Sequence, residues 1–306
     1  MKKNKIFKNV LALGLVVSTL AVGFTSFAKD ENVIKIGVSP TPHGDIAKVA
    51  EKVLEKEGYK LDIKEIDDYV TPNTALDEGE LDANYFQHYP YLENFNKENN
   101  TKISPIGTVH IEPMGIYSEK YKSLDELKDG DEVVIPNDAT NGARALKLLE
   151  KNGLIKLDPK AGVEATEKDI TDNPKNLKIV PAEAASIPSL YSDAGLGVIN
   201  SNYALDAGLN PVKDSLAIES EDNPYANVIA VKEGEEQDPK FKALLKAFQS
   251  DEVKKYIEDE FSGSIIPAFS SIYDGTFDTS KFGITNENSN SNENKDNVEK
   301  EDSSNK

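Results

Sequence analysis

Val33-Ile-Lys-Ile-Gly-Val38 opens the pattern that decides the fold of this chain. This apolar run predicts a buried strand. After a loop, residues 45–56 have the apolar spacing of a helix that ends at Gly58. Leu61-Asp-Ile-Lys-Glu-Ile66 then alternates between apolar and polar residues, as a second strand does. A strand, a helix and a strand of these lengths form a βαβ unit, which predicts a parallel sheet with helices packed on its faces.

The residues before this unit have the features of an export signal. Four lysines precede an apolar run from Val10 to Phe24, and Ser26 and Ala28 are the small residues that suit a cut after Ala28. Residues 1–28 are therefore predicted to be a secretory signal peptide, so the protein is expected to be exported and extracytoplasmic. The alternative is an uncleaved membrane anchor, but the run is short for a bilayer and is diluted by Gly and Ser.

Composition limits the possible partners. The formal net charge is −19, and loss of the four early lysines would make it −23, because no acidic residue precedes Asp30. Such a charge argues against nucleic acid, whose phosphates need basic patches. There is no cysteine, so neither disulfides nor thiol chemistry contributes. Residues 283–306 are almost free of apolar side chains and are predicted to be a disordered acidic tail.

A second α/β pattern follows the first. Ile106 to Tyr117 is a long extended stretch that contains Pro113 and Gly115, which suits a crossing segment better than a central strand. Asn227 to Val231 is interpreted as the return crossing. Further strands are expected at 81–86, 132–135, 177–180 and 197–200, and further helices from Thr71 and at 143–151, 186–191, 239–250 and 251–260.

Together these patterns predict an α/β fold of the periplasmic-binding-protein kind. Two α/β lobes, joined by two crossing segments, would close on a cleft like a clamshell. Lobe 1 is assigned to residues 32–112 plus 229–275, and lobe 2 to residues 113–228. The last two predicted helices are expected to pack back on lobe 1.

Residues 82–91, Asp-Ala-Asn-Tyr-Phe-Gln-His-Tyr-Pro-Tyr, suggest what lines that cleft. Five rings fall within seven positions of this stretch, in a chain with only 8% Phe, Trp and Tyr. Rings interleaved with amides suit a pocket wall, although a partly buried helix start is the alternative. The stretch, Tyr69 and the loop at 39–44 all follow predicted strands, where open α/β sheets bind ligands.

Polar candidates come from the second pattern. Thr140 to Arg144 lies where a strand passes into a helix, and a helix N-terminus attracts anions. Arg144 could form a bidentate pair with a carboxylate. Asn202 and Asn227 could donate to and accept from a ligand head group, although each could equally be a turn or cap residue.

Six runs of sequence resemble the NlpA/MetQ-type methionine-binding lipoproteins of ABC importers. The resemblance covers about Val33 to Phe269, and the runs are Asp82 to Glu93, His110 to Gly115, Ile135 to Arg144, Val198 to Tyr203, Asn223 to Asn227 and Ile266 to Phe269. It implies a bilobed binding protein, not an enzyme, that needs no cofactor. Its implied ligand is methionine, its D-form, a methionine dipeptide or another apolar amino acid, and its implied partners are a membrane permease and an ATPase.

The resemblance also implies a set of site residues. The aromatic box around a methionine side chain would be Tyr69, Phe86, His88, Tyr91 and His110. Arg144 would take the α-carboxylate, and Asn202 and Asn227, with Glu112 nearby, would hold the head group. Sulfur favours aromatic neighbours, by about 0.3–1.5 kcal/mol per contact, which agrees with this assignment.

One departure and two alternatives stand beside this interpretation. Family members usually carry a lipid-modified cysteine. This sequence has no cysteine, so lipid anchoring through cysteine is impossible for it. His43, His88 and His110, with Glu112, could instead form the zinc site of a metal-transport protein. Ser39, His43 and Asp45 could be arranged as a hydrolytic triad, but no nucleophile-elbow motif supports an enzyme.

Overall fold

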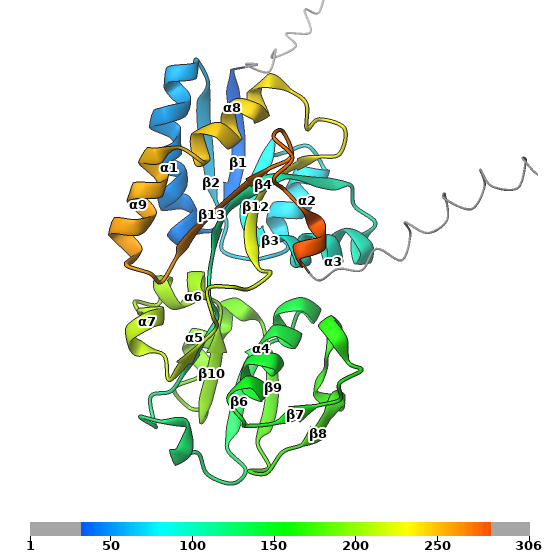
Figure 1. Ribbon diagram of the computed structural model, residues 1–306, viewed down its shortest axis with the longest axis vertical. Helices are drawn as coiled ribbons and strands as arrows, with labels where there is room; N and C mark the ends of the chain where they lie inside the picture. Colours follow the sequence, from blue (N-terminus) through cyan, green and yellow to red (C-terminus); the bar gives the residue numbers. More distant parts are fainter. Residues whose placement is uncertain (1–31, 283–306) are drawn as a thin grey trace, which may run out of the picture. The chain divides into compact units, whose positions relative to one another are not determined.

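The computed structural model describes residues 32–282. The predicted signal peptide and acidic tail both lie outside these residues. Within the described part, two mixed parallel and antiparallel sheets, of six and five strands, form the framework, and helices pack against them (Figure 1). The predicted α/β class and the two-sheet organisation are therefore confirmed.

The first sheet contains the predicted βαβ unit. Its strand order is β13-β4-β12-β3-β1-β2, in which β1 pairs in parallel with β2 and β3, while β12 and β13 run antiparallel to their neighbours. The strands are β1 (Val33–Val38), β2 (Lys60–Glu65), β3 (Ala83–His88), β4 (Ile103–Ile111), β12 (Ala226–Lys232) and β13 (Ile266–Ser271).

Helices cover both faces of this sheet. The side chains of α1 (Asp45–Leu54), α8 (Pro239–Phe248) and α9 (Asp251–Phe261) share one core with the strands, and α2 (Thr71–Asp77) and α3 (Tyr89–Asn99) share another. Strand β12 contributes side chains to both cores: Ile229 and Val231 belong to the first core, and Val228 and Ala230 to the second. A strand buried on both faces is apolar throughout, as this one is.

The second sheet has the order β11-β5-β10-β6-β9. Helix α4 (Ala139–Lys151) packs in the core on one face, and α5 (Ile187–Leu190) and α6 (Ser201–Asp206) in the core on the other. The strands are β5 (Gly115–Tyr117), β6 (Glu132–Pro136), β9 (Lys178–Ala182), β10 (Leu196–Ile199) and β11 (Ala217–Ile218). The remaining elements are a two-stranded pair, β7 (Lys156–Leu157) with β8 (Ile170–Asp172), and helix α7 (Pro211–Asp214).

The chain passes twice between the sheets. The first passage joins β4 to β5 within the stretch 106–117 that was predicted to cross, but residues 106–111 of that stretch belong to β4, which pairs with a strand on each side. The predicted position of the return is wrong, because 227–231 is a buried part of β12 and the passage lies in 219–225 instead. The final helices pack on the first sheet as expected. The exact lobe boundaries stay a prediction.

One local prediction is also wrong, and one strand was not predicted. Helix α4 begins at Ala139, four residues before the predicted start, because the Asp138 side chain accepts a hydrogen bond from the Asn141 backbone and caps the helix there. Arg144 therefore lies in the second turn. Strand β13 was not predicted, since Pro267 and its mixed composition hide an edge strand paired with β4.

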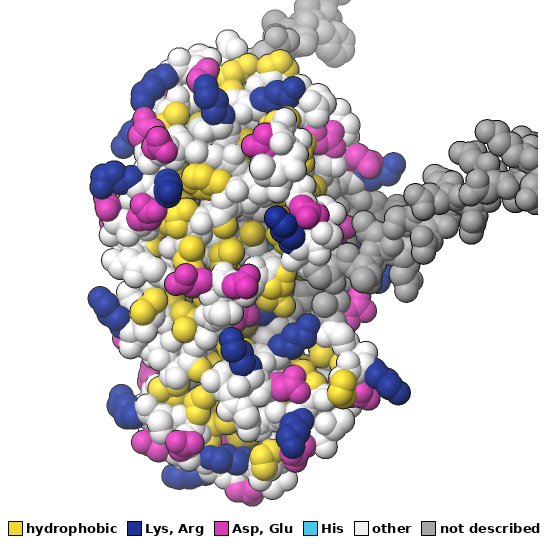
Figure 2. Space-filling model, in the orientation of Figure 1, with side chains coloured by type: hydrophobic (Ala, Val, Ile, Leu, Met, Phe, Trp, Pro, Cys, Tyr) yellow, Lys and Arg dark blue, Asp and Glu magenta, His cyan; other side chains and the backbone are white. Residues whose placement is uncertain are grey.

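The visible surface carries both signs of charge. Basic and acidic side chains are interspersed over the face in Figure 2, so no broad basic patch is seen there. Within residues 32–282, no helix combines the length and the apolar composition needed to cross a lipid bilayer.

Candidate functional site

A cavity lies where elements of both sheets meet, with about 330 Å³ of non-atom space when the open solvent at its mouth is included. Twelve residues line it: Tyr69, Phe86, Gln87, His88, Tyr91, Glu112, Asn141, Arg144, Asn200, Ser201, Asn202 and Asn227. They come from the ends of β3, β4 and β10, from β12, from helices α3, α4 and α6, and from the loop after β2.

Three rings form what we call the aromatic end: Tyr69, Phe86 and Tyr91. Their ring centroids are 5.8 to 6.2 Å apart, at tilted or edge-to-face angles. The Tyr91 hydroxyl donates to the Tyr69 backbone carbonyl at 2.8 Å, which fixes two of the rings against each other. Such a surface suits an apolar, polarisable group.

His88 joins the aromatic end to the amides. It caps α3, because its Nδ1 accepts a hydrogen bond from the Tyr91 backbone N–H at 3.1 Å. Its Nε2 must then carry the proton, and it donates to Asn141 Oδ1 at 3.0 Å. Burial, followed by the charge of Arg144, lowers the pKa of His88 to about 3, so the ring is neutral at pH 7.

The other end is polar, and we define it by Glu112, Arg144, Asn200, Asn202 and Asn227. Arg144 is 3% exposed and donates through Nε and Nη2 to the Glu219 carboxylate, and through Nη2 to the Glu112 backbone carbonyl at 2.6 Å. The pKa of Arg144 is raised, because pairing with Glu219 outweighs the effect of its burial. Its Nη1 makes no hydrogen bond to any residue in the described part of the chain.

Arg144 also contacts a ring that the sequence did not single out. Its guanidinium carbon lies 4.2 Å from the ring centroid of Tyr225, and the same ring lies 5.1 Å from His88. Stacking of this kind holds the plane of a guanidinium group. Tyr225 and Glu219 thus hold Arg144 from two sides, and neither of them hydrogen-bonds to Nη1.

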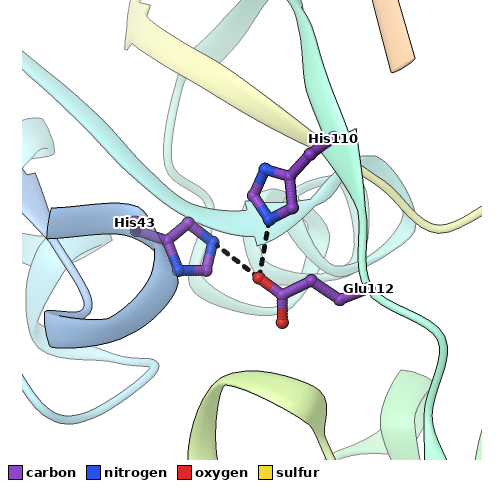
Figure 3. Close-up of side chains that lie close together, drawn as sticks. All are labelled: His43, His110 and Glu112. Carbon is purple, nitrogen blue, oxygen red and sulfur yellow. Dashed lines mark hydrogen bonds and ion pairs between the residues drawn. The ribbon is translucent and has the colours of Figure 1, made fainter. Parts of the chain in front are cut away.

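Behind the polar end lies a buried hydrogen-bonded chain, and Figure 3 shows three of its members, His43, His110 and Glu112. Tyr85 donates its hydroxyl proton to His110 Nδ1 at 2.5 Å, so His110 Nε2 carries the other proton and donates to Glu112 Oε1 at 2.7 Å. His43 Nε2 lies 3.3 Å from the same oxygen and 3.0 Å from Asn227 Oδ1. Glu112 Oε2 accepts from the Asn202 backbone N–H at 3.1 Å.

Burial sets the charges in this chain. It lowers the pKa of His43 to about 4 and that of His110 to about 3, so both rings are neutral at pH 7. Burial also raises the pKa of Glu112, although His43, Arg144 and the Asn202 backbone oppose this effect. Glu112 accepts hydrogen bonds from His110 Nε2 and from the Asn202 backbone N–H, and both contacts favour its ionised form. The polar end therefore combines this buried carboxyl group with the paired charge of Arg144.

The cavity gathers eight of the nine residues expected to bind a ligand. His110 is the exception: it is fully buried behind Glu112 and does not line the cavity. Four lining residues were not predicted to bind, namely Gln87, Asn141, Asn200 and Ser201. All four lie in the sequence runs that carry the resemblance, so their positions could have indicated that they line the cavity. Their residue types alone could not. That the lining residues bind a ligand stays a prediction.

Neither of the two alternative sites is formed as predicted. In the described residues one group of His and acidic side chains is close enough to share an ion: His43, His110 and Glu112, with candidate ligand atoms within 4.8 Å of one another. The predicted three-histidine site is wrong, because His88 faces Asn141 instead. His110 Nε2 hydrogen-bonds to Glu112, and His43 Nε2 hydrogen-bonds to Asn227 Oδ1 while lying 3.3 Å from Glu112 Oε1, which is the geometry of a hydrogen-bonded chain.

The hydrolytic triad is also wrong. His43 faces Asn227 and Glu112, while the Asp45 carboxylate accepts a hydrogen bond from the Thr41 hydroxyl at 2.9 Å. His43 and Asp45 therefore do not form the pair that would activate a serine.

Comparison with known proteins agrees with this geometry. The chain is 44% identical over 265 residues to the D-methionine-binding lipoprotein MetQ of Salmonella typhimurium, an alignment that covers 85% of this chain and 97% of that protein. It is 43% identical over 269 residues to the methionine-binding lipoprotein MetQ of Bacillus subtilis, covering 86% and 98%. A nutrient-binding protein from Burkholderia cenocepacia, solved bound to methionine, superposes with a TM-score of 0.76 at 47% identity over 77% of this chain and all of that one.

The family model described as NlpA lipoprotein matches residues 34–269, which span both sheets and every residue of the cavity. The resemblance inferred from the sequence runs is thereby confirmed, and the chain belongs to the NlpA lipoprotein family.

Proposed function

We propose that this protein is an extracytoplasmic substrate-binding protein, not an enzyme, that captures methionine and delivers it to an ABC importer. The observation that carries this proposal is one cavity with rings at one end and unpaired hydrogen-bond donors at the other. Methionine has this polarity, with an apolar thioether at one end and a charged head group at the other.

The donors at the polar end suit an α-carboxylate. Tyr69 donates to Asn202 Oδ1 at 2.6 Å, and His43 faces Asn227 Oδ1, so each amide directs its NH₂ group elsewhere. These two groups and Arg144 Nη1 make no hydrogen bond within the described residues. Together they supply the donors that a carboxylate needs.

The aromatic end suits the methionine side chain. Tyr69, Phe86 and Tyr91 surround an apolar group without offering it a charge, and sulfur–aromatic contacts add about 0.3–1.5 kcal/mol each. Tight binding of a ligand with so few heavy atoms requires near-complete enclosure, since even the best small ligands gain at most about 1.5 kcal/mol per atom. Residues from both sheets line the cavity, so a ligand there would be contacted from both.

Calorimetric titration of the stripped protein with L-methionine and D-methionine tests the proposal. We expect micromolar or tighter binding of at least one enantiomer, and native mass spectrometry of unstripped protein should show the same bound mass. Methionine dipeptides and norleucine define how wide the specificity is. Failure of all these ligands to bind would overturn the proposal.

Delivery to an importer is a separate part of the proposal. It is supported by the MetQ relatives, and the expected partners are a membrane permease with its ATPase. Reconstituted permease–ATPase complex should hydrolyse ATP faster when the methionine-loaded protein is added. Equal rates with the loaded protein and with buffer would contradict this part and leave methionine binding intact.

A further inference from the structure

A second cavity lies beside the one described above and has no part in the proposed function. It has about 530 Å³ of non-atom space when the open solvent at its mouth is included, and it shares two rings with the first cavity. We call it the outer cavity. Three carboxylates and three rings line it, namely Asp68, Asp138, Glu183, Tyr69, Tyr91 and Tyr203. The other lining residues are one valine, one asparagine and two alanines, so no basic residue of the described chain lines it.

The carboxylates bring uncompensated negative charge to this cavity from both sheets. Asp68 follows β2 of the first sheet, while Asp138 precedes α4 and Glu183 follows β9 of the second. Each accepts hydrogen bonds from backbone N–H groups, hydroxyls or side-chain amides. Within residues 32–282, no Lys, Arg or His forms an ion pair with any of the three. A concave site lined by charges of one sign attracts ions of the other sign.

The arrangement of these acids does not suit a metal ion. In the part of the chain that the structure describes, the side chains close enough to share an ion are His43, His110 and Glu112, and none of them lines the outer cavity. The three carboxylates are instead spread around a space that also has aromatic and aliphatic walls. Tyrosine faces attract ammonium groups and cover methylene groups. The outer cavity therefore suits an organic cation.

Tyr203 gives independent evidence for a ligand with N–H donors. Its side chain lines the outer cavity and is only 5% exposed, yet its hydroxyl makes no hydrogen bond to any residue between 32 and 282. Its ring packs against Tyr69, with the centroids 5.0 Å apart. Burial, followed by the charges of four acidic residues around it, raises the pKa of Tyr203, so the hydroxyl stays protonated and neutral. Buried hydroxyls are normally hydrogen-bonded, and this one has free lone pairs that can accept from an ammonium group.

We propose that the outer cavity is a second binding site, and that its ligand is a small aliphatic diamine. The ammonium groups pair with carboxylates from the two sheets, and one of them donates a hydrogen bond to the Tyr203 hydroxyl. The methylene chain lies against the tyrosine rings. Two ammonium groups neutralise more of the three negative charges than one does, which favours a diamine over a monoamine. The site is distinct from the methionine cavity, because Tyr203 and the three carboxylates do not line that cavity.

Calorimetric titration of the protein with putrescine tests the proposal. Salt at about 0.15 M screens the unspecific attraction of a chain with a net charge of −19. We expect a Kd below about 1 mM for putrescine and a Kd at least about threefold higher for butylamine, which has one ammonium group. Tetramethylammonium, which has no N–H, should bind more weakly still. Saturating methionine should not displace putrescine.

Two variants locate the site. Tyr203→Phe removes only a hydroxyl without a partner, so it should weaken putrescine binding by about 3- to 10-fold and leave methionine affinity and the melting temperature unchanged. Glu183→Gln removes one charge but keeps an oxygen for Asn137, and it should weaken putrescine binding by a similar factor. Glu55→Gln is the matched control: it changes the net charge equally, at an exposed residue that lines neither cavity. It should change putrescine affinity by less than about twofold.

The alternative outcomes would each overturn the diamine site. Absence of putrescine binding would do so directly. One-for-one displacement of putrescine by methionine would place the amine in the methionine cavity. Equal binding of tetramethylammonium and putrescine, or equal weakening by Glu183→Gln and Glu55→Gln, would reduce the interaction to unspecific charge attraction. None of these results would affect methionine capture, and failure of methionine to bind would leave the diamine site standing.

Discussion

At the aromatic end of the cavity, Tyr69, Phe86 and Tyr91 are held by ring contacts and by one hydrogen bond to backbone. At the polar end, every amide and carboxylate is tied to another side chain, and the chain of contacts reaches back to Tyr85 and Asp138. The first arrangement tolerates changes of shape, because dispersion contacts have weak directionality. The second fixes each donor and acceptor, because a reversed amide would strand a buried partner.

The two ends also differ in their origin along the chain. The rings lie between Tyr69 and Tyr91, within elements of the first sheet or the loop after β2. The polar end draws on α4 and the end of β10 from the second sheet as well as on β12 from the first. Changes at the polar end should therefore have large effects on both stability and binding, and changes at the aromatic end small effects on selectivity.

The largest effect is expected from Arg144→Ala. It removes the proposed carboxylate ligand and leaves Glu219 without its cation, so methionine should bind more weakly by about 3–5 kcal/mol and the melting temperature should fall. Calorimetric titration and thermal melts by circular dichroism measure the two effects.

A double variant separates the effect on methionine binding from the effect on stability. Arg144→Ala with Glu219→Gln removes both charges, so we expect it to recover stability relative to Arg144→Ala but not binding. Recovery of binding as well would show that Arg144 acts only by neutralising Glu219, and a binding loss below about 1 kcal/mol in Arg144→Ala would place the residue outside the site.

A pH-dependent loss of stability comes next. The pKa of His88 is about 3 in the folded protein and near 6.5 in an unfolded chain. Between these two pH values the unfolded chain binds a proton at His88 and the folded protein does not. Stability should therefore fall as the pH drops, by about 2 kcal/mol from His88 between pH 7 and 5. Urea unfolding at both pH values measures it.

The matched variant is His88→Gln, which keeps a donor for Asn141 but does not titrate. Glu112 acts in the opposite sense, because burial raises its pKa and its folded form takes up a proton first as the pH falls. Since that contribution is common to both proteins, their difference isolates His88. The same pH dependence in both would mean that His88 is protonated in the folded protein.

A smaller effect is expected at the aromatic end. Phe86→Leu keeps an apolar wall but removes a ring, so it should weaken methionine binding by about 1 kcal/mol and norleucine binding by less, because only methionine has sulfur. Phe95→Leu is the control, since Phe95 packs with Phe86 and Tyr91 but does not line the cavity. Equal losses for both ligands would indicate a change of shape and not a lost sulfur contact.

The sequence could predict the aromatic end and much less of the polar end. Five rings within residues 85–91 are visible in one short run, and the βαβ pattern before them places the run at a strand end. Asn141 and Asn200 are 59 positions apart, and His43 and Asn227 are 184 apart. Only the folded sheets bring such pairs together, so the pattern could name Asn202 and Asn227 as candidates but could not show which side chains they meet.

The misplaced residues have a common physical cause. His110 was assigned to the aromatic box by the resemblance, but its ring is fully buried between Tyr85 and Glu112, so only Glu112 reaches the cavity. Asn200 was not named as a candidate, because the sequence marked it only as the last residue of a predicted strand. Its place in the hydrogen-bond chain through Asp138 and Asn141 depends on the fold, which the sequence does not display.

The smallest effect is expected from removal of metal ions. His43, His110 and Glu112 lie close enough to invite an ion, but Tyr85 occupies His110 Nδ1, and the N–H groups of both rings face the Glu112 carboxylate. An ion between them would have to displace those protons and the contact of His43 with Asn227. Treatment with EDTA should therefore leave both the melting temperature and methionine affinity unchanged. Tyr85→Phe should be the more damaging change, since it frees His110 to adopt the other tautomer. If EDTA lowered the melting temperature and zinc restored it, the group would be a metal site and the orientation assigned to Asn227 would have to be revised.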